Sequence, residues 1–202
     1  MTEPTRRRGR RPAGEDARAE IVAAARTEFA ARGFDGTSLR GIARAAGVDP
    51  RLVHHYFEGK EDLFVAAFKF PARPAEIVPT VFGPGLDGAG ERMARFFFSV
   101  WDSPPGRETL LGLIRSAATS EQAAELLRQF VTRAILARAV EFLPGEDAAL
   151  RIELAVAQRL GSIFLRFVIR VEPLASCDVE DLVALLAPTV QTYLSGGHST
   201  SG

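Results

Sequence analysis

The chain has 202 residues, with 25 Lys and Arg balanced by 25 Asp and Glu, so its formal net charge is zero. Apolar residues make up 47% and charged residues 25%, which is typical of soluble globular proteins and excludes collagen-like, wholly disordered and disulfide-scaffold chains. The single cysteine, Cys177, permits no internal disulfide and favours a reducing compartment. No uncharged apolar run reaches the length of about 18 residues that a membrane span requires, and no secretory signal follows the basic N-terminus. We therefore expect a cytoplasmic protein without a membrane partner.

The two ends of the chain carry opposite charge. Residues 1–60 hold 12 Lys and Arg against 8 Asp and Glu, a net of +4, and residues 61–202 have a net of −4. Five of the six residues from Arg6 to Arg11 are arginine, and residues 1–14 hold almost nothing that could pack, which predicts a disordered basic arm. This asymmetry suggests that the N-terminal end binds nucleic acid or another anionic surface.

Four helices are predicted after this arm. The first begins near Asp16, carries Ile21, Ala25 and Phe29 on one face at intervals of four residues, and ends at Gly33. The second helix is expected to begin at a cap, Thr37 or Ser38, and to end at Gly47. The third is expected to run from Pro50 to Gly59, and the fourth to begin at Lys60.

The sequence pattern also predicts helices in the C-terminal two thirds of the chain. Residues 71–90 are rich in proline and glycine, so we expect a loop-rich junction there that could contain a helical turn. No segment alternates apolar and polar residues over a sustained length, so no sheet is expected and the fold class is all-α. Residues 196–202 are small and polar and are expected to form a disordered tail. The helices expected between these two segments lie near 87–102, 106–117, 120–142, 146–171 and 178–195.

The most informative segment is TSLRGIARAAGVDPRLVHHYFEGK, which runs from Thr37 to Lys60. Two short helices joined by a tight turn form a helix-turn-helix, which Leu39, Ile42, Val48, Val53 and Phe57 can pack together. Arg51, His54 and His55 then lie on the opposite face of the second helix, where cationic and aromatic side chains suit the major groove of DNA. Spacing alone also allows an ordinary pair of helices with a solvated face.

Residues from about 16 to 68 resemble the N-terminal domain of the TetR (tetracycline-repressor) family of bacterial transcriptional regulators. The resemblance is carried by the spaced matches ARGF, GTSLRGIARAAGV, HHYF and GKEDLF, which together are far more specific than a bare helix-turn-helix. It implies a three-helix DNA-binding domain followed by a helical domain for ligand binding and dimerisation. On this basis we assign residues 15–60 to the first domain and residues 61–195 to the second.

The resemblance also implies a role for individual residues. Thr37, Ser38 and Arg40 match positions at which family members contact the DNA backbone, and Arg51 and Leu52 match positions that vary with the operator sequence. The positions implied to lie against phosphates or beside them are His54, His55, Tyr56 and Lys60. His54 stands where a tyrosine is common. The basic arm is either a solvated tail or a segment that enters the minor groove, and we favour the second interpretation.

Aromatic residues suggest a pocket for a small apolar or amphipathic effector in the second domain. Three consecutive phenylalanines, Phe96, Phe97 and Phe98, cannot all face one core, although core packing explains most such residues. Arg95, Arg133 and Arg166 could anchor an anionic effector. The predicted pocket residues are Phe97, Trp101, Phe130, Arg133, Phe164 and Phe167.

The last two helices each carry an apolar stripe. In the family that the sequence resembles, these helices pair with their copies in a homodimer, and two-fold symmetry lets two recognition helices reach successive major grooves. An intramolecular core would give similar stripes. The residues predicted for the dimer interface are Ile152, Val156, Leu160, Ile163, Leu182, Leu186, Val190 and Tyr193.

No coherent catalytic pattern emerges from the sequence. The glycine pattern at residues 83–88 resembles a dinucleotide-binding fingerprint but lacks the surrounding strands, and adjacent His54 and His55 diverge on a helix and have no spaced third ligand. We therefore expect no enzymatic activity, no cofactor and no metal. The predicted function is a repressor that a small-molecule effector releases from a palindromic operator. The alternatives are a sequence-independent DNA-binding protein and an enzyme with a helical apolar pocket.

Overall fold

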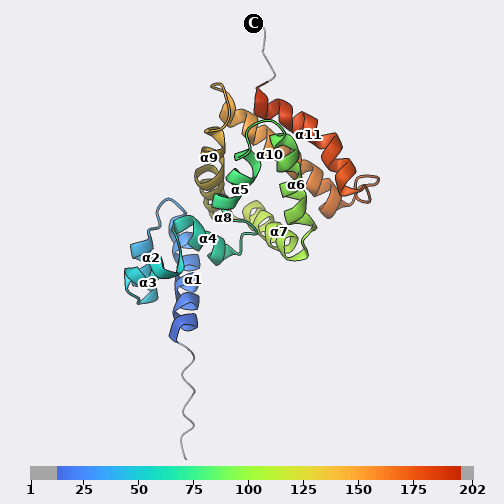
Figure 1. Cartoon of the computed structure of the whole chain (residues 1–202). Helices are drawn as coiled ribbons and strands as arrows, with labels where there is room; N and C mark the ends of the chain where they lie inside the picture. The colour runs from blue at the N-terminus through green and yellow to red at the C-terminus, as the bar shows by residue number, and fades with distance from the viewer. Residues whose placement is uncertain (1–12, 197–202) are drawn as a thin grey trace, which may run out of the picture. The chain divides into compact units, whose positions relative to one another are not determined.

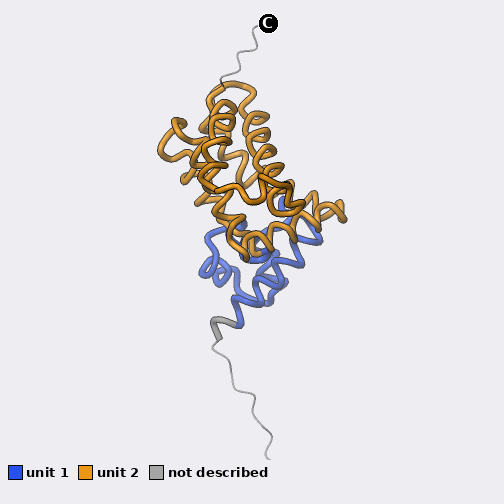
Figure 2. The backbone as a smooth tube through the Cα atoms, turned by 90° about the vertical axis from the view of Figure 1, so that its right-hand side faces the viewer, with its two compact units in different colours: residues 1–68 blue, residues 69–202 orange. Residues whose placement is uncertain are grey.

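The computed structural model describes residues 13–196, and this part of the chain contains helices and no strand (Figure 1). The all-α prediction is therefore confirmed. The expected arm at residues 1–12 and tail at 197–202 lie outside the described residues, whereas Ala13 and Gly14 belong to the first helix. The chain divides into two compact units, one ending at Phe68 and one beginning at Lys69 (Figure 2).

The first unit consists of α1 (Ala13–Arg32), α2 (Leu39–Ala46), α3 (Pro50–Tyr56) and α4 (Lys60–Phe68). Ile21, Ala25 and Phe29 are fully buried on α1, as their spacing predicts. The Phe29 ring meets the Phe64 ring of α4 edge-on at 5.2 Å between centroids. The side chain of Arg26 on α1 donates two hydrogen bonds to the carbonyl oxygen of Ala67. α4 therefore packs within the first unit, and the division along the chain falls after Phe68 rather than at the expected residue 60.

Local capping fixes the turn between α2 and α3. Ser38 caps α2, because its hydroxyl accepts a hydrogen bond from the Gly41 amide at 3.1 Å. Gly47 ends α2 with a φ of 68°, a left-handed conformation that glycine adopts without the steric cost of a Cβ. Asp49 caps α3 by accepting from the Arg51 amide at 2.7 Å, and Pro50 occupies the first helical turn.

The second unit is a larger helical bundle. Its elements are α5 (Pro74–Phe82), α6 (Ala89–Asp102), α7 (Pro104–Thr119), α8 (Glu121–Phe130), the π-helix η1 (Val131–Leu136), α9 (Ala137–Val140), α10 (Ala148–Ile163), the π-helix η2 (Phe164–Ile169) and α11 (Val179–Ser195). The expectation of a loop-rich segment over residues 71–90 is wrong where α5 forms a regular helix. Pro74 lies in its first turn, where no amide hydrogen bond is lost, and burial of Val78, Val81 and Phe82 stabilises the helix despite Pro79.

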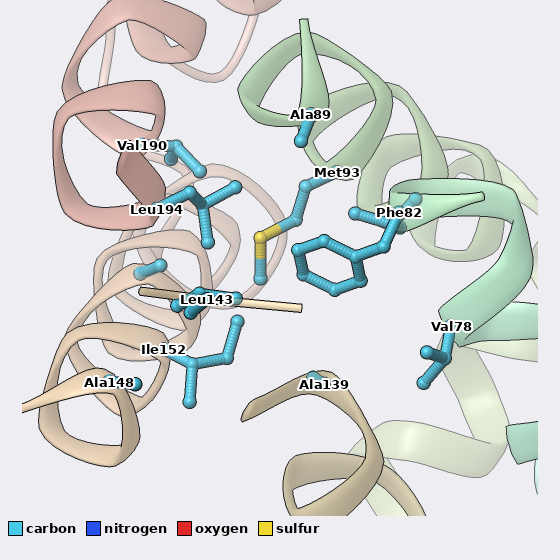
Figure 3. Packing of buried hydrophobic residues seen from close by; sticks show 12 residues of the cluster. Val78, Phe82, Ala89, Met93, Ala139, Leu143, Ala148, Ile152, Val190 and Leu194 are labelled. Atoms are coloured by element: carbon cyan, nitrogen blue, oxygen red, sulfur yellow. The ribbon is translucent and has the colours of Figure 1, made fainter. Parts of the chain in front are cut away.

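One apolar core joins the helices of the second unit (Figure 3). Met93 of α6 lies between Phe82 of α5 and Leu194 of α11, and Ile152 of α10 lies across from them (Figure 3). A second cluster lies around Phe98 and includes Trp101, Ile163 and Leu182. These two cores hold α6, α10 and α11 together and so determine which faces of α10 and α11 remain accessible.

Helices α6 and α11 approach each other closely at Gly90. A Cβ on Gly90 would lie 2.5 Å from the carbonyl oxygen of Ala187 and 2.6 Å from the amide nitrogen of Gln191. The Gln191 side chain also accepts from the Gly90 amide and donates to the carbonyl oxygen of Leu86, both at 2.9 Å. Any side chain at position 90 must therefore push α6 away from the backbone of α11.

We expect Gly90→Ala to lower the free energy of unfolding by about 2 kcal/mol or more, because backbone atoms of α11 cannot yield as a flexible side chain would. Gly112→Ala is the matched control, since a Cβ there meets nothing within 4 Å in α7. Higher helix propensity should make that variant more stable by about 0.5–1 kcal/mol. Urea denaturation of both variants tests the argument, and equal shifts at the two glycines would contradict it.

Candidate functional site

The outer face of α3 carries the residues that the sequence predicts for DNA recognition. Arg51, His54 and His55 are exposed, whereas Val53 and Phe57 are buried against the rest of the first unit. This division confirms the predicted packing of the two short helices. Leu52 is half-buried and lies beside Arg51 on α3. The exposed face can therefore offer a guanidinium and two imidazoles to base edges or phosphates.

The residues at the start of α2 differ in what they can offer. Ser38 and Arg40 are exposed, although the Ser38 hydroxyl already caps α2. Thr37 is only 4% exposed, and its hydroxyl donates to the carbonyl oxygens of Gly33 at 2.7 Å and Glu28 at 3.2 Å. Its side chain therefore does not fit the predicted contact with the DNA backbone. Thr37 instead fixes the connection between α1 and α2.

Lys60 and Tyr56 lie at the edge of the same unit, and both are half-buried. The Lys60 ammonium donates to the carbonyl oxygen of Phe34 at 3.0 Å and lies 4.5 Å from the centroid of the Phe34 ring. The Tyr56 ring packs edge-on against His55 at 5.0 Å. An ammonium carries three hydrogens, so the internal bond of Lys60 leaves donors for a phosphate. Its phosphate contact stays a prediction.

Two short capped helices, a tight turn and an exposed face of arginine and histidine define the class of this protein. It has the helix-turn-helix architecture of DNA-binding proteins, with α3 at the position of the recognition helix and α1 and α4 packed behind it. Among the described residues, no helix is long and apolar enough to cross a membrane. The same residues contain no group of three His, Cys, Asp or Glu side chains that could hold a metal ion.

Comparisons with known proteins agree with this class and extend it. The family profile described as "Bacterial regulatory proteins, tetR family" matches residues 21–67, and "Tetracyclin repressor-like, C-terminal domain" matches residues 87–194. The chain therefore belongs to the TetR family of transcriptional regulators.

Individual relatives cover different parts of the chain. The HTH-type transcriptional regulator BetI of Brucella abortus is 26% identical over 188 residues, which span 90% of this chain and 93% of BetI. The HTH-type transcriptional repressor AcnR of Corynebacterium glutamicum is 39% identical over 64 residues, or 31% of this chain and 34% of AcnR. The crystal structure of a TetR-family regulator from Streptomyces coelicolor A3 is 38% identical, with a TM-score of 0.50 over 92% of this chain and 98% of that one.

The second unit contains an apolar cavity with a volume of about 220 Å³. Every residue that lines it is apolar, and the lining comes from the segment before α5 and from α5, α6, α7, α8, η1, α9 and α10. Such a cavity can hold an apolar group and exclude water from it. Its lining includes Phe70, Val81, Met93, Phe97, Trp101, Leu113, Val131, Ile135, Val156 and Leu160.

The cavity contains only part of the predicted pocket. Phe97 and Trp101 line it, but Phe130 packs into the core against the Phe70 ring at 5.2 Å. Phe167 stacks on Trp101 at 6.3 Å and does not line the cavity. Arg133 and Phe164 are exposed outside it. The prediction is therefore wrong for four pocket residues, whose side chains are turned away from the cavity by the orientation of their helices. These residues are Phe130, Arg133, Phe164 and Phe167.

Sequence reasoning identified only the α6 part of this lining, and α5 and η1 show why the rest was missed. Ile77, Val78 and Val81 belong to α5, which lies in the segment expected to be a loop. Val131 and Ile135 belong to η1, whose wider turn shifts the helical register after α8. The apolar run from Ile77 to Phe82 was the available signal for α5, but no local pattern marks a π-helix.

The arginines considered as effector anchors have other partners. Arg95 on α6 forms ion pairs with Glu91 at 2.9 Å and with Glu180 of α11 at 2.6 Å. The hydrogen bond from Arg95 lowers the pKa of Glu180 and raises that of Arg95. Arg166 donates to the carbonyl oxygens of Leu174 and Cys177. None of the three arginines considered from the sequence lines the cavity.

Burial corrects the predicted dimer interface at most of its residues. Ile152, Ile163, Leu182 and Val190 are at most 4% exposed within the chain's own core, and Val156 and Leu160 line the cavity. Leu186 and Tyr193 pack against the two core clusters. Seven of these side chains are therefore engaged inside the chain, because most of the stripe read from the sequence faces the core. Leu160 is also 41% exposed, so its place in the interface stays a prediction.

A different apolar face of α10 is exposed. Leu150, Leu154, Ala157, Gly161, Phe164 and Val168 recur at intervals of four and three residues, and we call them the outer seam. Leu150 is 58% exposed and Leu154 is 41% exposed. On α11, which packs beside α10 (Figure 1), Leu185 is 71% exposed and Pro188 is exposed too. Contiguous exposed apolar residues of this kind indicate an interaction surface.

Proposed function

We propose that this protein is a homodimeric repressor that binds a pseudo-palindromic operator and leaves it when a small effector enters the apolar cavity. The observation that carries the DNA-binding part is the exposed face of α3, where Arg51, His54 and His55 stand clear of the core. Membership of a family of transcriptional regulators supports the same conclusion. The natural location of such a protein is the bacterial cytoplasm, where it meets DNA.

The outer seam supports the homodimer. A two-fold axis makes one surface complementary to itself, so a single apolar seam on α10, with α11 beside it, suffices for two copies. Ala157 and Gly161 lie within the seam, and their small size allows two helices to approach closely. The dimer would present two α3 helices to successive major grooves, one helical turn of DNA apart.

The apolar cavity supports control by an effector. A ligand shifts a conformational equilibrium only by its difference in affinity for two states, so the effector must favour a form whose recognition helices do not fit the operator. The cavity contains no polar lining residue, so its occupant must carry an apolar body. α4 follows the recognition helix and directly precedes the second unit in sequence, so we assign it the role of transmitting the change.

The operator itself can be found by sequencing the genomic DNA that the protein binds. With that operator, Arg51→Ala should weaken binding by about 5- to 150-fold and relax sequence preference at one base position in each half-site. Gel shifts and selection from randomised operators measure both effects. Arg32→Ala is the matched control, because Arg32 is an exposed arginine of α1 that pairs with Glu28. An unchanged base preference in Arg51→Ala would show that Arg51 does not read a base.

The same gel shifts separate this proposal from sequence-independent DNA binding. Equal affinity of the unaltered protein for operator and random DNA at physiological salt would favour the sequence-independent alternative. The outcome for Lys60→Ala should differ from that for Arg51→Ala. Loss of a phosphate contact weakens binding to every sequence, and loss of the bond to Phe34 should also lower stability.

A further inference from the structure

Arg159 of α10 is the least satisfied buried charge among the described residues. Its side chain is 1% exposed, and Nε and Nη1 have no hydrogen-bond partner. Only Nη2 donates, to the Gln158 side chain and to the carbonyl oxygen of Leu186, both at 3.2 Å. Burial lowers the pKa of Arg159 to about 10, so the guanidinium is still charged at neutral pH. No carboxylate of the described part of the chain pairs with it.

This environment is not a general property of arginines on α10. Arg151 lies on the same helix and is 6% exposed, yet its Nε, Nη1 and Nη2 all donate hydrogen bonds. A buried charge without partners is strongly unfavourable, and replacing such a group with an apolar residue is often neutral or stabilising. Unpaired buried polar groups are rare in folded proteins and call for a specific explanation. A ligand that supplies the missing acceptors is one such explanation.

Arg159 follows cavity-lining residues along α10. Ile152, Val156 and Leu160 of α10 line the cavity. Arg159 lies seven residues after Ile152, so it is on the same face of α10 two turns further on. It also lies between Val156 and Leu160 in sequence. Phe97 of α6 also lines the cavity, and it packs against both core clusters of the second unit.

We propose that the effector is an amphipathic carboxylate whose apolar body fills the cavity and whose carboxylate pairs with Arg159. This inference rests on the proposed control by an effector and specifies the effector's chemical class. The carboxylate accepts hydrogen bonds from Nε and Nη1, the two nitrogens without partners. Arg159 does not itself line the cavity, so an intervening apolar side chain must move when the carboxylate enters. A charge-assisted pair formed away from water then distinguishes carboxylates from uncharged molecules of the same shape.

Matched pairs of ligands test the proposal on the full-length protein. Isothermal titration calorimetry compares octanoate with 1-octanol, and 3-phenylpropanoate with 3-phenylpropan-1-ol, which differ within each pair only in the charged head. We expect at least one carboxylate to bind about tenfold more tightly than its alcohol. Titration of the unaltered protein therefore shows whether it binds carboxylates more tightly than the matching alcohols.

Variants of Arg159 test whether this residue is the reason for the selection. Arg159→Met should remove the preference for the carboxylate and retain binding of the alcohol, while its melting temperature stays the same or rises. Arg159→Gln provides the same comparison with a polar, uncharged side chain if the methionine variant does not fold. Arg133→Met is the control, because Arg133 is exposed and does not line the cavity, and its preference should not change.

The outcomes separate this inference from the proposed function. If alcohols and carboxylates bind equally in the unaltered protein, or if the Arg159 variants retain the preference, the assignment of Arg159 is wrong but control by an apolar effector stands. If no probe of either kind binds, the inference is overturned together with the effector part of the proposed function. Gel shifts of the same preparation then show independently whether DNA binding remains.

Discussion

Replacing Leu154 with glutamate should convert the proposed dimer to a monomer and weaken operator binding by about a hundredfold or more. Leu154 lies in the outer seam, 41% exposed in the single chain. Two-fold symmetry would introduce a carboxylate from each copy into the same apolar interface, where each loses its hydration without gaining a cation. A monomer offers one recognition helix instead of two linked ones, so the gain in affinity from simultaneous binding at both half-sites is lost.

Sedimentation velocity measures the oligomeric state of Leu154→Glu, and gel shifts measure its affinity for the operator. Ala149→Glu is the matched control, because Ala149 is exposed in the first turn of α10 but lies outside the outer seam. That variant should remain dimeric and bind normally. A dimeric Leu154→Glu would show that the interface lies elsewhere on the chain.

Arg151→Met should lower the free energy of unfolding by about 3 kcal/mol, because it removes a buried cation that bridges three segments. Nε donates to the Asp147 carboxylate at 2.9 Å, and Nη1 donates to the carbonyl oxygen of Tyr193 at 2.7 Å. Nη2 donates to the carbonyl oxygen of Pro144. The substitution leaves these acceptors without their partner and frees the last turn of α11, which Arg151 ties to the start of α10.

Arg159→Met is the control for this prediction as well, because it removes a second buried arginine from the same helix. The hydrogen bonds of each arginine determine whether its loss should destabilise the protein. All three nitrogens of Arg151 donate, whereas Nε and Nη1 of Arg159 are unpaired. Urea denaturation at neutral pH should therefore show a large loss of stability for Arg151→Met and none for Arg159→Met. A similar loss for both variants would mean that burial alone, and not pairing, determines the contribution of these arginines.

The helix-turn-helix could be predicted from the sequence because its signals act over short distances. The cap at Ser38, the turn at Gly47 and the cap at Asp49 each involve atoms no more than four residues apart. The spacing of Ile21, Ala25 and Phe29 identified the buried face of α1. The predicted contact of the Thr37 side chain with DNA was wrong, because its hydroxyl bonds to carbonyl oxygens of α1 and of the turn after it. The local sequence pattern does not reveal these hydrogen bonds.

Local sequence signals did not suffice to predict the packing of the second unit. Prolines and glycines predicted a loop over residues 71–90, but burial of the apolar side chains of α5 in the core outweighs the cost of Pro79. α10 carries apolar residues on its core side, its cavity side and the outer seam, so an apolar stripe can be assigned to a partner only after the helix is placed. The sequence-based choice of Ile152 and Ile163 for the dimer selected the core side.

By itself, the sequence determined the helical fold, the DNA-recognition motif and the concentration of positive charge in residues 1–60, because capping, periodicity and charge are local properties of the chain. Only the tertiary structure decided which apolar residues enclose the cavity, which remain exposed in the outer seam, and which buried arginine has nitrogens without partners. These features depend on how α5, α6, α10 and α11 rotate and pack against one another. Packing of this kind is set by contacts between residues far apart in sequence, and no local pattern encodes it.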